Sequence, residues 1–147
     1  MEEKFNYNTE KHLEFIESNI SRMNKCSFQM KGWTLTIISA LLAVYATEVS
    51  IKEENTNLIY LCILPTSIFW VLDSYYLSKE KKFMALYKDV AQIRSDSKSR
   101  EIKPYDMSIT EYKGWKYNVF RNMFSMSEWI LYLILICIFV LFAKYIA

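Results

Sequence analysis

Residues 58–77 read LIYLCILPTSIFWVLDSYYL and contain a single charged residue, Asp73. A helix needs about 20 mostly apolar residues to cross the roughly 30 Å hydrocarbon core of a bilayer. This stretch meets that requirement without extension. It therefore predicts a membrane-spanning helix, and the other segments of the chain can be assigned on either side of it.

Two further apolar runs flank this stretch, Trp33–Ala46 and Trp129–Ala143. Extended to residues 30–47 and 127–146, each approaches the length that a span requires. Aromatic residues, which membrane interfaces favour, lie near the ends of all three runs: Trp33, Tyr45, Tyr60, Tyr75, Trp129 and Tyr145. The sequence thus predicts an all-α integral membrane protein with three transmembrane helices. The alternative is that the two shorter runs are buried helices of a soluble protein.

Lys and Arg residues are divided unevenly among the segments outside these runs. Five precede the first run, one separates the first from the second, eleven lie between the second and third, and one follows. Because cytoplasmic loops are enriched in Lys and Arg, this predicts a cytoplasmic N-terminus and a cytoplasmic 78–128 segment. No cleavable signal peptide is recognisable, since the first run begins only after about thirty amphipathic residues. We expect the chain in the inner membrane of a bacterium.

The segments outside the runs are predicted to be helical, because the chain contains only two Gly and two Pro residues. Residues 8–29 place apolar side chains at intervals of three and four, which is typical of an amphipathic helix with Asn8 or Thr9 as its N-cap. The second span is expected to continue from Leu77 to about residue 94. The helical spacing persists there at Phe83, Leu86, Tyr87, Val90 and Ile93.

The remaining cytoplasmic residues are assigned by turn and capping signals. Residues 95–107 have the polar composition of a loop. Ser108–Glu111 fits a capping box, which predicts a cytoplasmic helix over residues 109–124. A second such box precedes the third span. These elements form a single membrane domain over residues 1–147.

The sequence holds little material for catalysis. His12 is the only histidine, which rules out a multi-histidine metal site and leaves almost no material for a histidine-based triad or general base. The glycines are isolated, and no phosphate-binding glycine loop exists. The three cysteines do not have metal-site spacing: Cys26, Cys62 and Cys137. We expect no enzyme activity, no metal and no cofactor.

The first span carries a stripe of small side chains: Thr36, Ser39, Ala40 and Ala43. Such a stripe permits close helix packing, and it also suits the lining of a pore. We expect the first span at the centre of a homo-oligomer and the third span against lipid.

Asp73 is an ionisable group within a predicted span, where a charge is costly. Two interpretations are open for it. Because it lies about one turn from the cytoplasmic end, Arg22 or Lys31 would be near enough to pair with it. Alternatively, it takes part directly in gating or ion passage. Pro65, in the same span, is expected to kink the helix.

The cytoplasmic segment between the second and third spans is basic and aromatic. Lys and Arg neutralise phosphates, and aromatic faces stack bases, so this composition suits a nucleotide or a short single strand. Attraction to lipid headgroups would require the same residue types. The candidate ligand-binding residues are Lys81, Lys82, Lys88, Arg94, Arg100 and Tyr87.

Two segments, residues 21–33 and 69–77, resemble small bacterial membrane effectors of the SLATT type, as do the residues that follow the second segment: Glu80, Phe83, Leu86 and Tyr87. Within that group the pattern is similar to the transmembrane component of Hailong-type anti-phage systems. The resemblance covers about the first ninety residues.

The resemblance implies an oligomeric pore or ion channel whose opening depolarises the membrane and arrests an infected cell. It also implies a partner nucleotidyltransferase that makes the regulating nucleotide or single-stranded DNA oligomer. That ligand keeps the pore closed in Hailong-type systems and opens it in others. The alternative function is a non-channel membrane adaptor, which would recruit a cytosolic partner through the amphipathic helix over residues 8–29 and the stripe of Phe83, Leu86 and Val90.

Overall fold

The computed structural model describes the backbone of residues 2–51, 61–93 and 102–146. Within these residues the protein is all-α and contains four α-helices and one 3-10 helix. They are α1 (Glu2–Ile51), α3 (Ile63–Val90), the 3-10 helix η1 (Trp115–Tyr117), α4 (Val119–Met123) and α5 (Met126–Ile146). Side chains are described for residues 9–47, 61–93, 102–125 and 129–141.

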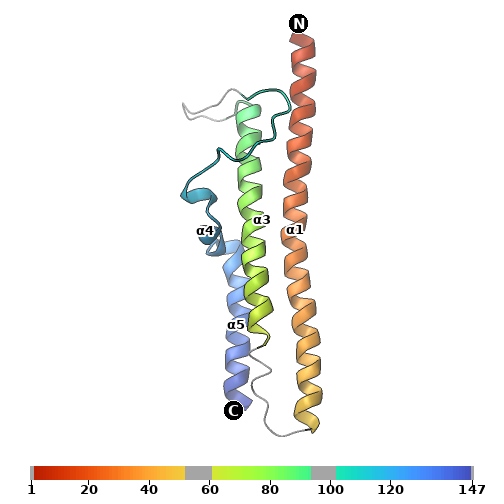
Figure 1. Ribbon diagram of the computed structural model, residues 1–147, viewed down its shortest axis with the longest axis vertical. Coiled ribbons are helices and arrows are strands. Elements are labelled where there is room, and N and C mark those ends of the chain that lie inside the picture. Colours follow the sequence, from red (N-terminus) through yellow and green to blue (C-terminus); the bar gives the residue numbers. More distant parts are fainter. Residues whose placement is uncertain (1, 52–60, 94–101, 147) are drawn as a thin grey trace.

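The helices form an elongated bundle in which α3 is the common neighbour (Figure 1). Helix α1 runs beside the whole length of α3 and extends beyond it, and α5 lies along the lower half of α3. The segment from residue 102 to α4 covers the upper half of α3. The N-terminus lies at the upper end of the bundle and the C-terminus at the lower end.

Helix α1 is a single helix of 50 residues, about 75 Å long at 1.5 Å per residue. It passes without interruption through both predicted segments, 8–29 and 30–47. The expected N-cap at Asn8 or Thr9 is wrong, because both residues lie inside the helix that starts at Glu2. The amphipathic helix and the first apolar run are therefore mechanically one rod.

Helix α3 begins at Ile63, whereas the sequence predicted a start at residue 58, and residues 58–60 lie outside the described residues. The expected kink at Pro65 has no cause in this fold. Pro65 lies in the first turn of α3, where a backbone N–H has no acceptor within the helix in any case.

Helix α3 ends at Val90, short of the predicted residue 94. Gln92 adopts φ 54°, and its N–H donates to the Asp89 carbonyl. The Ile93 N–H donates to the Lys88 carbonyl at 3.0 Å, which completes a Schellman motif. The motif satisfies the last carbonyls of the helix, so the chain turns although the apolar spacing continues to Ile93.

The predicted helix over residues 109–124 is wrong. Ser108 does not start a helix: its N–H donates to Asp106 Oδ1, and its hydroxyl bonds the Thr110 hydroxyl. Residues 102–114 form turns and extended chain, and helix α4 begins only at Val119, where the Asn118 side chain accepts from the Phe120 N–H. Tertiary contacts of this segment with α1 and α3 override the capping box.

An upper core joins the 102–117 segment to α1 and α3. Ile16, Leu86 and Tyr112 are its buried centre, one from each part of the chain. The Tyr112 hydroxyl donates to buried Asp89 at 2.7 Å, and His12 Nε2 donates to the Asp106 carbonyl at 3.1 Å. Residues packed around the centre are Ile20, Phe83, Ala85, Tyr87, Val90, Ile102, Met107, Ile109 and Tyr117.

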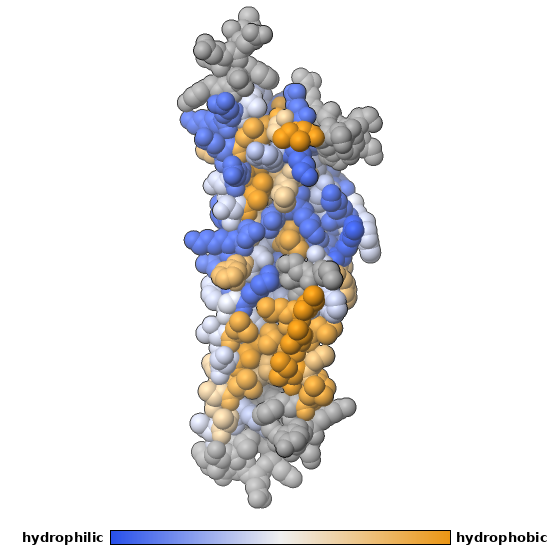
Figure 2. Space-filling view, turned by 180° about the vertical axis from the view of Figure 1, so that it is seen from behind, coloured by the Kyte–Doolittle hydropathy of each residue, from blue (hydrophilic) through white to orange (hydrophobic). Residues whose placement is uncertain are grey.

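A smaller lower core joins α1, α5 and the start of α3. Ile38, Cys62 and Phe139 are buried, and Leu41, Leu42 and Leu135 pack against them. Around this core the surface is apolar. Figure 2 shows mostly hydrophobic residues over the lower half of the face it displays, and hydrophilic residues mixed with some hydrophobic ones over the upper half.

One candidate membrane span is found within the described residues, Thr9–Thr47 of α1, by length and composition. Being near the N-terminus, it also meets the description of a signal sequence. The apolar part of α5, Trp129–Leu141, is shorter.

We predict that Tyr112→Phe destabilises the upper half of the bundle by about 1–3 kcal/mol, because a buried carboxylate loses a hydroxyl donor. Thermal unfolding of the detergent-solubilised protein would show a lower Tm. Tyr75→Phe, at an exposed tyrosine, is the matched control and should leave the Tm unchanged. Equal Tm values for both variants would contradict the importance of the Tyr112 contact.

Candidate functional site

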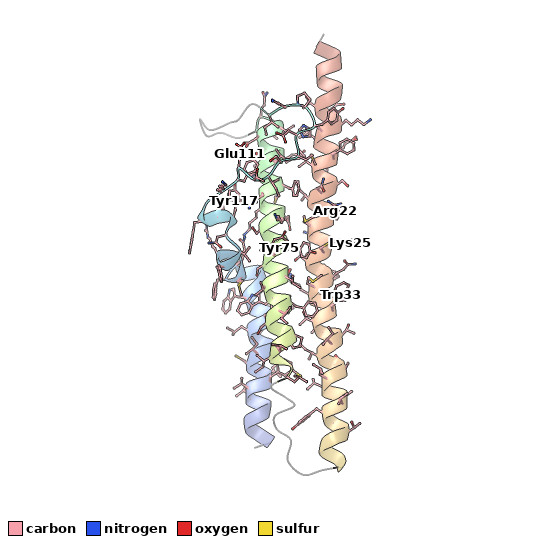
Figure 3. All side chains as sticks on the ribbon, viewed as in Figure 1. Arg22, Lys25, Trp33, Tyr75, Glu111 and Tyr117 are labelled. Carbon is pink, nitrogen blue, oxygen red and sulfur yellow. The ribbon has the colours of Figure 1, made fainter. Side chains whose placement is uncertain are left out.

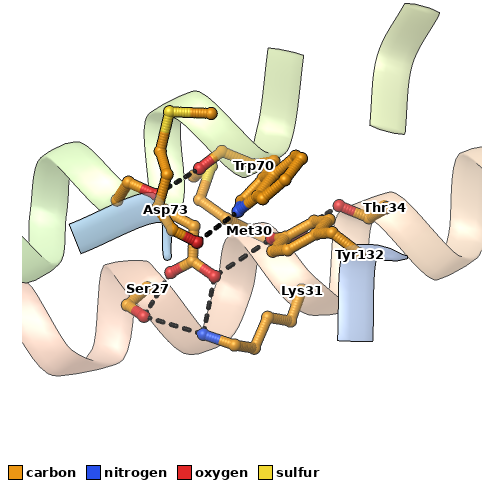
Figure 4. Close-up of polar contacts among 9 residues, drawn as sticks. Ser27, Met30, Lys31, Thr34, Trp70, Asp73 and Tyr132 are labelled. Carbon is orange, nitrogen blue, oxygen red and sulfur yellow. Dashed lines mark hydrogen bonds and ion pairs between the residues drawn. The ribbon is translucent and has the colours of Figure 1, made fainter. Parts of the chain in front are cut away.

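The side chain of Asp73 is completely buried where the three long helices meet (Figure 4). Its Oδ1 accepts a hydrogen bond from the Ser27 hydroxyl of α1. Its Oδ2 forms an ion pair with Lys31 Nζ of α1 at 2.6 Å and accepts from the Tyr132 hydroxyl of α5 at 3.0 Å. One carboxylate of α3 therefore binds both neighbouring helices.

The first interpretation of Asp73, pairing with Lys31, is confirmed. Lys31 also donates to the Ser27 hydroxyl at 3.1 Å, so the three groups form a closed triangle. Arg22, the other expected partner, donates instead to Asn19 Oδ1, one turn earlier on α1, at 2.5 Å. It lies nearer the N-terminus of α1 than Lys31, well above Trp33 in Figure 3.

Aromatic side chains enclose this network on the α5 side. The ring of Trp70 stacks on Tyr132, with centroids 6.0 Å apart and planes at 15°. Trp70 Nε1 donates to the Met123 carbonyl of α4 at 3.1 Å. The rings and the hydrogen bond hold the Tyr132 hydroxyl in place beside Asp73 and exclude water from it.

The network marks the boundary between the apolar and polar halves of the bundle. Below it, no charged residue occurs in residues 32–47 of α1, 61–72 of α3 or 129–141 of α5. Above it, Lys and Arg are frequent on α1, on α3 and in the segment from residue 102 to α4. Asp73 and Lys31 are thus the last charges before the apolar half, and they are paired with each other.

The four predicted pore residues, Thr36, Ser39, Ala40 and Ala43, are all exposed in the protomer. At 100° per residue they lie on the face of α1 opposite its buried residues Thr34, Ile38 and Tyr45, among others. The hydroxyls of Thr36 and Ser39 donate to carbonyls of their own helix at 3.0 and 2.8 Å. Nothing in the described part of the chain covers this face.

The predicted ligand residues do not converge on one point. Lys81 is half-buried and donates to Asn122 Oδ1 of α4 at 2.6 Å. Lys88 is exposed two turns further along α3, about 10 Å away, and Lys82 is on another side of the helix. Tyr87 packs against the upper core. Arg94 and Arg100 lie outside the described residues.

Sequence reasoning missed Ser27 and Tyr132 as partners of Asp73. The available signal for Ser27 was its position four residues before Lys31 on the same face of one helix. Tyr132 is the only residue with a hydroxyl group in residues 129–141 of the third apolar run. An isolated hydroxyl in such a run indicates a partner elsewhere in the fold.

The Phe83, Leu86 and Val90 stripe, which an adaptor would use, is occupied within the protomer. Leu86 is buried against Ile16 and Tyr112, and Phe83 and Val90 pack around them.

Among the described residues, no three His, Cys, Asp or Glu side chains come together as metal ligands do.

Burial raises the pKa of Glu80 above its ordinary value. A hydrogen bond with Asn24 and the charges of Lys81 and Lys31 oppose this shift without cancelling it. Glu80 lies about two turns above Asp73 on α3, and its side chain is hydrogen-bonded to Asn24 of α1. Burial therefore disfavours the ionised form of Glu80, which is the form that neutral and high pH impose.

Comparisons with known proteins give no match: no family model matches the chain, and neither a curated protein nor a solved structure is similar to it. The site must therefore be interpreted from its own geometry.

We predict that Lys31→Met lowers the stability of the bundle by about 3–5 kcal/mol, because the Asp73 carboxylate remains buried without its counter-ion. Adding Asp73→Asn removes the stranded charge and should restore much of the loss. Thermal unfolding in detergent measures both. Lys25→Met, at an exposed position of α1, is the control; if it costs as much as Lys31→Met, the ion pair is not the cause.

We predict that Glu80→Gln raises the Tm at pH 7. The pKa of Glu80 is raised in the folded state, so folding favours the protonated side chain. The stability that protonated Glu80 contributes is complete below about pH 4, and it is lost as the pH rises through the folded pKa. The Tm gain should therefore disappear below pH 4. Glu14→Gln, at an exposed site, should change neither value. A lower Tm for Glu80→Gln at pH 7 would overturn this sign.

Proposed function

We propose that this chain is an oligomeric, pore-forming membrane effector whose three long helices span the bilayer. The observation that carries the proposal is the exposed face of α1 with Thr36, Ser39, Ala40 and Ala43. Small and polar side chains on an apolar helix gain little from lipid, whereas they permit close approach of a second helix and line a wet pore.

Membrane insertion of all three helices is supported by the exposed apolar surface of the lower half. Large apolar side chains are exposed on each helix there, including Leu35, Ile37, Val44, Leu64, Ile68, Val71, Leu133, Ile134 and Ile138. A patch this extensive favours contact with lipid or another chain over contact with water. Helix α5 is 21 residues long, about 31 Å, which matches the hydrocarbon thickness.

The orientation is proposed from the charge distribution. Eleven of the 18 Lys and Arg residues lie between Ser78 and Glu128, so the polar half of the bundle is placed in the cytoplasm. The Asp73 and Lys31 pair then lies at the cytoplasmic end of the spans. There its net charge of zero avoids the cost of an isolated charge in lipid.

A route from the cytoplasmic half to the spans is supplied by α1 and α3. Both are continuous through the level of Asp73, and both contribute to the upper core as well as to the carboxylate network. A ligand that shifts the upper core would change the relative position of α1 and α3 at Asp73. We assign the gate to this network and the pore lining to α1.

The proposed ligand is a nucleotide or DNA oligomer, made by a partner nucleotidyltransferase and bound at the basic cytoplasmic half. The biological role, depolarisation and growth arrest in anti-phage defence, comes from the resemblance to SLATT-type effectors. The adaptor alternative loses the support of the stripe, because Leu86 is buried and Phe83 and Val90 pack around the upper core within the protomer.

We predict that purified protein in liposomes conducts ions and that the conducting path follows the small face of α1. Ser39→Cys in a background without the native cysteines should give flux that a charged thiol reagent changes several-fold. Ile37→Cys, exposed on the flank of the same helix, is the matched control and should be insensitive. Absence of flux with every ligand, or equal sensitivity at both positions, would contradict a pore along this face.

The same liposomes test the ligand. A short oligonucleotide should change the flux of the wild-type protein, and the change should be lost when Lys81 and Lys82 are replaced by Glu. The charge-matched control replaces two exposed lysines of α1, Lys11 and Lys25, by Glu. A wild-type response in the Lys81 and Lys82 variant would contradict the assignment of the ligand to this part of α3.

A further inference from the structure

A cavity of about 470 Å³ opens between α3 and the segment that leads into α5. Three basic and three aromatic side chains line it: Lys81, Lys116, Arg121, Trp115, Phe120 and Phe124. No acidic residue is among those that line it. The cavity is therefore a positively charged, aromatic-walled site, and it is distinct from the dispersed lysines Lys82 and Lys88 further along α3.

Asn122 supplies a hydrogen-bond donor at this cavity. The residue is 1% exposed and belongs to the lining. Lys81 can only donate, so its 2.6 Å bond to Oδ1 fixes the orientation of the amide. Asn122 Nδ2 has no hydrogen-bond partner among the described residues. An unpaired buried donor is costly, and a small movement of the amide toward an acceptor in the cavity would remove that cost.

The donors around the cavity suit a phosphate group. Arg121 offers a planar set of N–H donors that matches two oxygens of a phosphate, and Lys116 adds a point charge. Asn122 adds a neutral donor, and Lys81 holds it in place. All of these groups donate hydrogen bonds to anionic oxygen, and no acidic residue in the lining repels it.

The aromatic walls lie at the level where the apolar half begins. Trp115, Phe120 and Phe124 are 70%, 71% and 71% exposed, which is unusual for such large rings. Phe124 comes two residues before helix α5, and its ring packs edge-on against Trp70. Aromatic side chains in this position are typical of a membrane interface.

We propose that this cavity binds the phosphate of an anionic phospholipid headgroup. Arg121, Lys116 and Asn122 contact the phosphate, and the exposed rings contact the upper acyl chains. The site rests on the membrane placement proposed above but does not require conduction. It would hold α4 at the bilayer surface and so fix the height of α3 in the membrane.

The test is a titration of the detergent-purified full-length protein with short-chain phosphatidylglycerol, followed by tryptophan fluorescence. Saturable binding is expected, and short-chain phosphatidylcholine should bind much less tightly. Replacing both Lys116 and Arg121 by Gln should weaken binding about 25-fold, the equivalent of about 1 kcal/mol for each cation removed. Asn122→Asp, which preserves an oxygen for Lys81, should abolish saturation because it adds a negative charge.

The matched control replaces Lys103 and Lys113 by Gln, which removes the same charge from exposed positions of the same segment outside the cavity lining. It should retain wild-type affinity. Equal weakening in both double variants, or wild-type affinity in Asn122→Asp, would overturn the site.

A parallel titration distinguishes the source of the phosphate. If a short oligonucleotide or inorganic phosphate binds more tightly than the lipid and depends on Lys116 and Arg121, the lipid assignment is overturned. The outcome is separable from that of the pore: lipid binding without ion flux contradicts only the proposed pore, and flux without lipid binding contradicts only this site.

Discussion

The buried carboxylate of Asp73 is the constraint around which the rest of the bundle is arranged. A charge with no access to water must be neutralised and hydrogen-bonded, or its burial destabilises the fold by several kcal/mol. Ser27 and Lys31 come from α1, and Tyr132 comes from α5. Because apolar packing alone tolerates sliding of one helix along another, this directional contact fixes the heights of α1 and α5 relative to α3.

The consequences of that register extend in both directions along α3. Upward, Leu86 lies level with Ile16 of α1, and the 102–117 segment packs over both. Downward, Ile38 of α1 meets Phe139 of α5. The side of α1 that carries Thr36 and Ser39 faces away from both cores. A face left uncovered in this way is available for another copy of the chain, which is the basis of the proposed pore.

The helix predicted over residues 109–124 does not form as expected because other interactions compete with it. A capping box is worth about 1 kcal/mol, and it acts only through neighbouring backbone groups. Tyr112 gains burial and a hydrogen bond to Asp89, which a helix through Ser108 and Gly114 would have to forgo. Gly114 adopts φ 128°, a conformation outside any helix. A local capping signal does not decide the structure where contacts with distant residues stabilise another conformation more strongly.

The sequence by itself determined the helical class, the division into apolar and polar halves, the continuity of α3 beyond Leu77 and the pairing options of Asp73. These features depend on residue types and on periodicity along one helix. Only the tertiary structure decided that Lys31 rather than Arg22 pairs with Asp73, that Tyr132 joins them, and that Lys81 and Arg121 border one cavity. Each of those outcomes depends on which side chains arrive from elements distant in the chain, and helical periodicity carries no information about the height at which two helices meet.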